Sequence, residues 1–279
     1  MGQTTSRIEQ ACTKHKSKPR SNKSVEEKKI NSAQTTGVLA LADSKLKEIP
    51  TTIITNVELQ VRLRSLDLSR NQITCVPAEI ITARLSNLKN LKLQSNALCS
   101  LPDLSQLIAL TKLVLDNNEL VEITAPLPPN LIKLSLRSNQ LRSITARITG
   151  CTLLKNLELE ENQISCIPPH FANLKDLEMI CIDNNRLTEL PKVLAECSRL
   201  RIVSVRQNKI VGTRQPQAIA VQILAQSNID ILNLDGNPIK KLELETMNGI
   251  SQFMERRKRL KNKGIGAGLS ADTSLCGLD

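Results

Sequence analysis

LKNLELEENQISCIP, residues 154–168, is the stretch that decides the fold of this chain. Apolar and polar residues alternate around Leu157 and Leu159, which predicts a short strand with both leucines facing a core. Glu158 lies between them, and we expect its side chain to face solvent. Asn162 follows the strand and predicts a turn, because its side-chain amide can bond backbone groups that the turn leaves unpaired.

The same arrangement recurs along the middle of the chain. LRSLDLSRNQITCVP begins at Leu63, LIKLSLRSNQLRSIT begins at Leu131 and LRIVSVRQNKIVGT begins at Leu200. The pattern L-x-x-L-x-L-x-x-N-x-L is identified as the leucine-rich repeat, in which stacked units bury leucines that one unit cannot bury alone. We therefore expect an α/β leucine-rich repeat solenoid over residues 36–249, a curved horseshoe with a parallel sheet on its concave face. The turn positions of its nine units are Ser44, Asn71, Asn96, Asn118, Asn139, Asn162, Asn185, Asn208 and Asn237.

The segments on either side of the repeats differ from them in composition. Residues 1–35 form a basic arm that we expect to be mostly disordered, with a short helix over residues 25–35 that leads into the first unit. Residues 250–263 are expected to form a basic helix that caps the last repeat, and residues 264–279 a disordered tail. The apolar face of the capping helix consists of Ile250, Phe253 and Met254.

Two flanking stretches carry a more specific resemblance. AQTTGVLALADSKLKEIP begins at Ala33, and GNPIKKLELETMNGISQFMERRKR begins at Gly236. Both are similar to the family of leucine-rich repeat-containing protein fifty-seven, small cytosolic proteins that also begin Met-Gly. The resemblance covers roughly residues 33–263, while the basic stretch near residues 11–30 and the C-terminal tail depart from it. It implies a lipid-anchored repeat protein that is not an enzyme.

Composition limits the core and the compartment. The core must be aliphatic, because the chain has two Phe, no Trp and no Tyr. No run of 18 apolar residues is present, and the first thirty residues lack the apolar centre of a secretory signal. The eight cysteines are scattered without a C-x-x-C pair, which argues against a disulfide framework or a metal site. We expect a cytosolic monomer with neither metal nor cofactor.

The first residues, MGQTTS, fit the pattern that N-myristoyltransferases read. Gly2 is therefore a candidate for N-myristoylation, and Cys12 is a candidate for an added palmitoyl chain. One acyl chain binds membranes only marginally, with an association constant of about 10⁴ M⁻¹, and basic residues add about 1 kcal/mol each near an anionic leaflet. The residues of the arm that we expect to contact the membrane are Arg7, Lys14, Lys16, Lys18, Arg20 and Lys23.

Positive charge is concentrated at the two ends of the chain. The net charge is +11: residues 1–35 and 250–263 contribute +5 each, residues 264–279 contribute −2, and the repeats carry about +3. Positive charge alone supports phosphate binding, but single-strand recognition normally adds aromatic stacking, which the absence of Tyr and Trp disfavours. We expect peripheral attachment to the cytosolic face of an anionic membrane rather than binding to nucleic acid. The alternative is a soluble regulatory subunit or nuclear adaptor whose basic termini contact nucleic acid or acidic proteins.

Outward side chains of neighbouring strands lie about 4.8 Å apart and form columns across the sheet. The column six positions before the turn begins polar and turns apolar in the last three repeats. Exposed apolar residues on a concave surface are typical of a protein-docking patch, although drift of the repeats or cover by a terminal segment explains them as well. The expected partner-binding residues are Lys112, Lys133, Met179, Cys181, Ile202 and Ile231.

The column two positions before the turn carries charges. It runs from Asp116 to Asp235 with partly alternating signs, and we interpret it as a self-paired ladder that keeps the sheet soluble. His15 and His170 are the only histidines, and no motif pairs either with a nucleophile. We expect no catalytic residues, and a scaffold or adaptor that binds an unidentified protein on its concave face.

Overall fold

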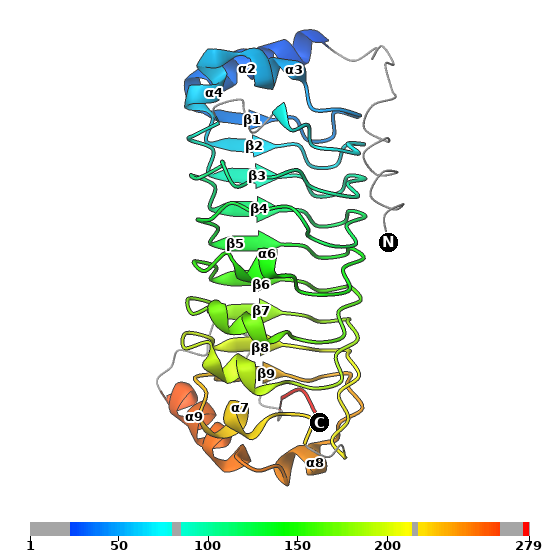
Figure 1. The fold of residues 1–279 in the computed structure, drawn as a ribbon, viewed down its shortest axis with the longest axis vertical. Helices are drawn as coiled ribbons and strands as arrows, with labels where there is room; N and C mark the ends of the chain where they lie inside the picture. The colour runs from blue at the N-terminus through cyan, green and yellow to red at the C-terminus, as the bar shows by residue number, and fades with distance from the viewer. Residues whose placement is uncertain (1–22, 80–84, 214–216, 263–275, 279) are drawn as a thin grey trace.

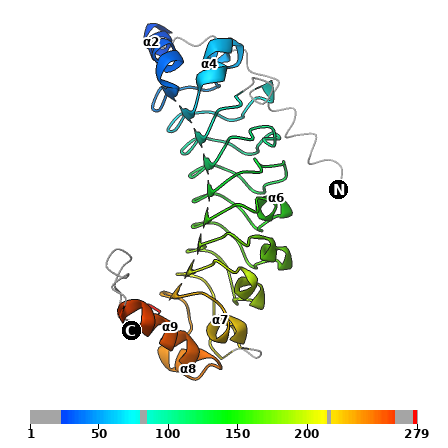
Figure 2. The ribbon, with the colours of Figure 1, turned by 90° about the vertical axis from the view of Figure 1, so that its left-hand side faces the viewer.

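The computed structural model describes residues 23–79, 85–213, 217–262 and 276–278. Nine strands of three residues stack in sequence order into one parallel sheet, which lines the inner side of an open, curved solenoid (Figures 1 and 2). The predicted α/β leucine-rich repeat solenoid is therefore confirmed. The strands are β1 Val38–Ala40, β2 Ser65–Asp67, β3 Asn90–Lys92, β4 Lys112–Val114, β5 Lys133–Ser135, β6 Asn156–Glu158, β7 Met179–Cys181, β8 Ile202–Ser204 and β9 Ile231–Asn233.

The turn asparagines tie each repeat to the one before it, as the sequence predicts. Asn162 Oδ1 accepts a hydrogen bond from the Leu141 backbone N–H at 2.9 Å. Its Nδ2 donates to the carbonyl oxygens of Leu136, Leu159 and Glu160 at 2.9 to 3.1 Å. The Asn162 side chain thus provides hydrogen-bond partners for backbone N–H and C=O groups at the turn, which the sheet leaves unpaired.

The core consists of the aliphatic residues that the repeat pattern predicts. Leu157 and Leu159 have no exposed surface, and the equivalent residues of the other repeats are buried with them. Phe171 is also fully buried. Short helices lie outside the sheet, in the connections between several of the strands (Figure 2). They are α3 Thr51–Thr55, α4 Val57–Arg62, α6 Ala146–Thr149, η1 Pro169–Asn173, η2 Lys192–Glu196 and α7 Val221–Ala225. A further short helix, α8 Lys241–Glu245, follows β9.

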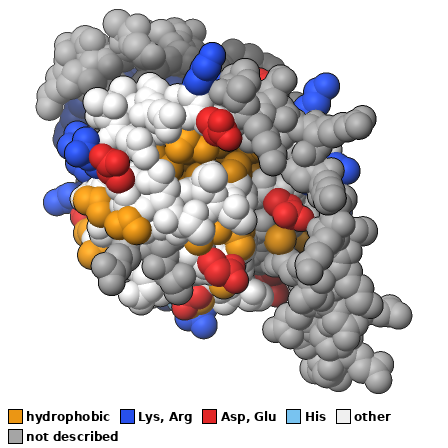
Figure 3. Space-filling view, turned by 90° about the horizontal axis from the view of Figure 1, so that it is seen from above, with side chains coloured by type: hydrophobic (Ala, Val, Ile, Leu, Met, Phe, Trp, Pro, Cys, Tyr) orange, Lys and Arg blue, Asp and Glu red, His pale blue; other side chains and the backbone are white. Residues whose placement is uncertain are grey.

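Helix α2, Lys23–Thr36, leads into the first repeat. The helix is followed by Gly37, whose φ of +70° lets the backbone turn into β1. A Cβ atom at this position would lie 2.6 Å from the Arg62 carbonyl oxygen, so the close approach of α4 also requires glycine here. Seen along the solenoid from this end, hydrophobic side chains reach the surface among polar ones (Figure 3).

Helix α9, Ile250–Asn262, covers the last repeat (Figure 1). Phe253 is fully buried on its inner face. Arg256 donates hydrogen bonds to the carbonyl oxygens of Ile229 and Ile223, at 3.3 and 3.1 Å. None of the described helices is long and apolar enough to cross a bilayer.

The end of the chain differs from the expected disordered tail. Residues 276–278 pack against the last repeat, where Cys276 is 2% exposed. The Leu234 backbone N–H donates to the Cys276 carbonyl oxygen at 2.8 Å. The expectation failed because three residues carry no periodic signal, and their contact partner lies about forty positions earlier in the chain.

Candidate protein-binding face

The last three strands bring the predicted apolar residues together. Met179 pairs in register with Ile202, and Ile202 pairs with Ile231, so the three side chains share one column on the concave side. All three are half-buried, and so is Cys181 in the neighbouring column. We name Met179, Cys181, Ile202 and Ile231 the apolar column. The apolar column runs across β7, β8 and β9.

The two predicted lysines lie on the other half of the same face. Lys112 and Lys133 pair in register on β4 and β5. The Lys133 ammonium group forms an ion pair with the Glu158 carboxylate. Lys133 therefore belongs to the charge network of this sheet. From the sequence, the lysines and the charged ladder are expected to form two separate columns.

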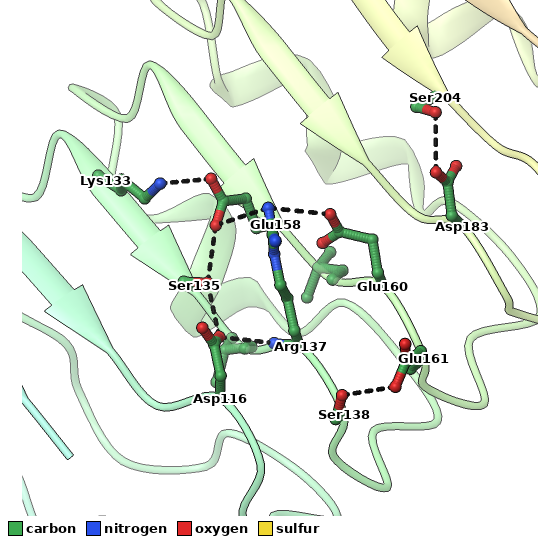
Figure 4. A network of polar contacts seen from close by, with 12 residues as sticks. Asp116, Lys133, Ser135, Arg137, Ser138, Glu158, Glu160, Glu161, Asp183 and Ser204 are labelled. Carbon is green, nitrogen blue, oxygen red and sulfur yellow. Dashed lines mark hydrogen bonds and ion pairs between the residues drawn. The ribbon is translucent and has the colours of Figure 1, made fainter. Parts of the chain in front are cut away.

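This network corrects the expectation that Glu158 faces solvent. Its side chain is only 6% exposed, because Lys133 and Arg137 fold over it, and Arg137 Nη2 lies 3.1 Å from Glu158 Oε2 (Figure 4). Burial alone would raise the pKa of Glu158, but hydrogen bonds from Lys133 and Ser135 and the Arg137 charge outweigh it and lower that pKa. An outward position on a concave sheet is thus not the same as an exposed one.

A serine joins this network to the preceding repeat. Ser135 Oγ lies 2.6 Å from Asp116 Oδ1 and 2.8 Å from Glu158 Oε2 (Figure 4). The Ser135 hydroxyl group has one proton, so it can donate a hydrogen bond to only one of the two carboxylates at a time. Asp116 Oδ1 also accepts a hydrogen bond from the Arg137 backbone N–H at 3.0 Å. The contacts of the first half of the face are therefore made largely within the protein, as the self-paired interpretation predicts.

The pairing breaks down at Glu160. Its Oε1 lies 3.1 Å from Arg137 Nη2, but its Oε2 is buried and has no hydrogen-bond partner among the described residues. The pKa of Glu160 is raised to about 7, mainly by burial and to a smaller extent by the Glu158 and Asp183 carboxylates, against the opposing effect of Arg137. Two acids, Glu160 and Asp183, are neighbours in this column. A buried carboxylate without full pairing is costly.

Hydrogen-bond pairing is also incomplete in the next two repeats. Asp183 accepts hydrogen bonds from Ser204 Oγ at 3.0 Å and from the Arg206 backbone N–H at 2.7 Å. Arg206 Nε is buried without a partner in the described part of the chain. Burial raises the pKa of Cys181 to about 12, helped by Glu160 and Asp183, so the thiol stays protonated at neutral pH. Cys181 therefore acts as a small apolar surface and not as a nucleophile.

Several predicted residues cannot be placed on this face. Lys23 is the first residue of α2, but the structure does not describe its side chain. His170 Nδ1 lies 2.9 Å from Thr149 Oγ1, away from the sheet. In the described ranges, no three His, Cys, Asp or Glu side chains are grouped to hold a metal ion. The remaining lipidation and membrane-contact candidates lie outside the described residues: Gly2, Arg7, Cys12, Lys14, Lys16, Lys18 and Arg20.

Comparison with known proteins agrees with this architecture. The leucine rich repeat family model matches residues 61–120. No curated protein matches the chain. Among solved structures, the chain is similar to a leucine-rich repeat protein of Leptospira interrogans, with 27% identity and a TM-score of 0.58. The match covers 78% of this chain and 58% of that protein, so the chain spans less than two thirds of its length.

Two further solved structures come from Listeria monocytogenes. Internalin C2 is 25% identical with a TM-score of 0.55, and the match covers 69% of this chain and 80% of that one. The functional domain of InlJ is 20% identical with a TM-score of 0.57, and the match covers 80% of this chain and 48% of that one. The InlJ similarity concerns the fold alone.

Proposed function

We propose that this leucine-rich repeat protein is a non-enzymatic scaffold that binds a protein partner on its concave face at the cytosolic side of a membrane. Leucine-rich repeat solenoids generally serve as protein-binding modules, and the long open sheet suits that role. The resemblance of both flanks to leucine-rich repeat-containing protein fifty-seven supports the same class. In this proposal, myristoylation of Gly2 and the basic arm hold the protein at an anionic membrane.

The apolar column is the observation that carries the partner-binding proposal. Met179, Ile202 and Ile231 lie in register across three neighbouring strands. A bound protein can cover these three half-buried side chains. Lys112 and Lys133 would then contact the rim of the same partner.

The partner-binding proposal is tested by introducing charge into the apolar column. The double variant Met179→Glu with Ile202→Glu should lose at least about 90% of partner recovery from cells, because two carboxylates must be desolvated in the interface. The melting temperature should change by no more than about 3 °C, since both side chains are only half-buried. Affinity purification from cells, with differential scanning fluorimetry on the same preparations, measures both effects.

A matched control uses the same column on the other half of the sheet. Asn90→Glu places a carboxylate six positions before the Asn96 turn, where the column is polar. It should leave partner recovery unchanged. Equal recovery by the double variant and the wild-type protein would instead favour simple drift of the repeats.

The membrane proposal combines two signals in the first residues. An acyl chain on Gly2 supplies marginal affinity, and the basic arm supplies electrostatic attraction that salt screens over about 8 Å at physiological ionic strength. Cys12 would add a second chain if it is palmitoylated. Neither signal alone holds the protein firmly in this account. The protein should therefore depend on both.

Gly2→Ala tests the acyl chain and should move the protein from the membrane to the soluble fraction. Replacing Lys14, Lys16, Lys18 and Arg20 by glutamine should weaken binding to anionic vesicles while leaving the acyl mass in place. Raising salt should reproduce the second effect but not the first. An unchanged membrane fraction after Gly2→Ala would favour the alternative, a soluble regulatory subunit or nuclear adaptor with basic termini.

A further inference from the structure

The edge of the sheet at β9 is not left open. Along the solenoid, the backbone N–H of the buried residue after each strand donates to the carbonyl oxygen of the third residue of the next strand. Ile182 donates to Ser204 in this way at 2.8 Å, and Val205 donates to Asn233 at 3.0 Å. After β9, Leu234 donates to Cys276 at 2.8 Å. Cys276 thus occupies the position of the third residue of a tenth strand.

The neighbouring residues fit this position closely. The Cys276 side chain belongs to the buried core, and Leu278 packs against that core. Gly277 has a φ of +78°, and a Cβ atom there would lie 2.9 Å from Asp235 Cβ. Burial raises the pKa of Cys276 to about 12, while the charge of Arg257 on α9 acts in the opposite direction. Cys276 is therefore buried against the last repeat.

We propose that the edge of β9 is a peptide-binding site of the strand-addition type and that the C-terminal segment of this chain, residues 276–278, is its bound ligand. Strand addition supplies affinity through backbone hydrogen bonds and specificity through pockets for individual side chains. Here the backbone bond is the one from Leu234, and the pocket holds the Cys276 side chain. The ligand motif is a small apolar residue, then glycine, then a larger apolar residue.

Occupation of this edge also protects the molecule. An open strand edge presents unpaired backbone groups and invites pairing with other chains. The segment that connects α9 to Cys276, residues 263–275, lies outside the described residues. Because the ligand is a separable piece of chain, a free peptide of the same sequence competes with it for the site.

The first test measures alkylation of the wild-type full-length chain by N-ethylmaleimide, with each cysteine followed by mass spectrometry. Cys276 should react at least about tenfold more slowly than the exposed Cys166, because it must first leave its site. Cys151 and Cys197, which are buried inside the repeats, report global opening. Labelling of Cys276 as fast as that of Cys166 would overturn the proposal.

The second test adds to the wild-type chain a synthetic peptide of residues 271–279 that carries Cys276→Ala, so that the peptide itself cannot be alkylated. Excess peptide should raise the labelling rate of Cys276 several-fold, because it fills the site whenever the chain's own segment leaves it. The same peptide carrying Gly277→Val should have no effect, since its side chain meets Asp235. Equal effects of the two peptides, or no effect of either, would contradict the proposed site.

The full-length variant Gly277→Val provides the third test. Its C-terminal segment should be displaced, so Cys276 should label at least about tenfold faster than in the wild type while Cys151 and Cys197 stay protected. The variant should also bind the wild-type peptide at least about tenfold more tightly than the wild-type chain does, measured by fluorescence anisotropy, because its site is vacant. Continued protection of Cys276 would overturn the proposal. If Cys151 and Cys197 also become reactive, the variant has unfolded and the two wild-type tests decide.

Discussion

Glu158 and Glu160 are two residues apart in the chain, yet the structure shifts their pKa values in opposite directions. Lys133, Ser135 and Arg137 stabilise the Glu158 carboxylate and lower its pKa, despite its burial. Burial raises the pKa of Glu160 to about 7, and Arg137 compensates only in part. At neutral pH, Glu158 is therefore ionised and paired, whereas Glu160 is close to half-protonated. The two carboxylates thus differ in charge at neutral pH, although both lie on the same face of the sheet.

This difference predicts how stability depends on pH. A raised pKa means that the folded protein holds the Glu160 proton more tightly than the unfolded chain, so stability falls as pH rises from about 4.5 to about 7. Glu160→Gln removes this loss. Relative to wild type, the variant should gain about 1 to 3 kcal/mol of unfolding free energy between pH 5 and pH 8, measured by urea denaturation.

Glu158→Gln is the matched control, because the pKa of Glu158 is lowered. Ionised Glu158 contributes stability above its unfolded pKa of about 4.5, and that contribution disappears as pH falls through its folded pKa. Glu158→Gln should therefore cost a nearly constant amount between pH 5.5 and pH 8, about 1 to 3 kcal/mol. If both variants show the same pH profile, the assignment of opposite shifts is incorrect.

Residue-level expectations from the sequence held for the buried leucines but not for Glu158. The alternation of leucines with polar residues predicts which side chains face inward, and Leu157 and Leu159 are buried accordingly. The exposure of an outward residue depends on whether side chains from the neighbouring strands cover it. Lys133 lies on β5, the strand before the one that carries Glu158. Its side chain covers the Glu158 carboxylate, and the repeat pattern of the sequence does not predict this contact.

At the scale of the element, the asparagine turns hold successive repeats together. Asn162 makes four hydrogen bonds to the backbone of its own repeat and the one before it. Asn162→Ala leaves one buried N–H and several carbonyl groups unpaired, and should lower the unfolding free energy by about 2 to 4 kcal/mol. Chemical denaturation followed by circular dichroism gives this value.

Asn130→Ala is the control for the turn prediction. Asn130 Nδ2 donates one hydrogen bond, to the Ile108 carbonyl oxygen at 2.8 Å, at an exposed position. Its loss should cost less than about 1 kcal/mol, since water can replace the bond. Similar losses for the two variants would mean that the turn asparagines do not link the repeats.

The predictability of an element depended on whether it repeats. Nine strands and their turns follow one pattern, so each copy supports the others in the sequence. The contact between Cys276 and Leu234 has no such support, because it joins one short segment to a distant strand edge. The apolar column was visible in the sequence for the same reason as the strands: its members recur at one position of consecutive repeats.

At the scale of the whole molecule, positive charge is concentrated at the two ends of the chain. The repeats carry about +3 of the net charge of +11, residues 1–35 and 250–263 carry +5 each, and residues 264–279 carry −2. Figure 2 shows the sheet on the inner side of the curved solenoid and short helices on its outer side. In the proposed function, the basic arm at one end would contact a membrane while the apolar column near the other end binds a partner.

Site-specific photo-crosslinking in living cells tests the central claim most directly, with a photoreactive amino acid at Ile202 in the apolar column. The control position is Val121, which is 43% exposed and lies outside the sheet. The account predicts a discrete protein adduct from Ile202 in the membrane fraction, and its loss when Met179→Glu is added. No adduct from Ile202, or the same adducts from both positions, would contradict the claim that the concave face binds a partner.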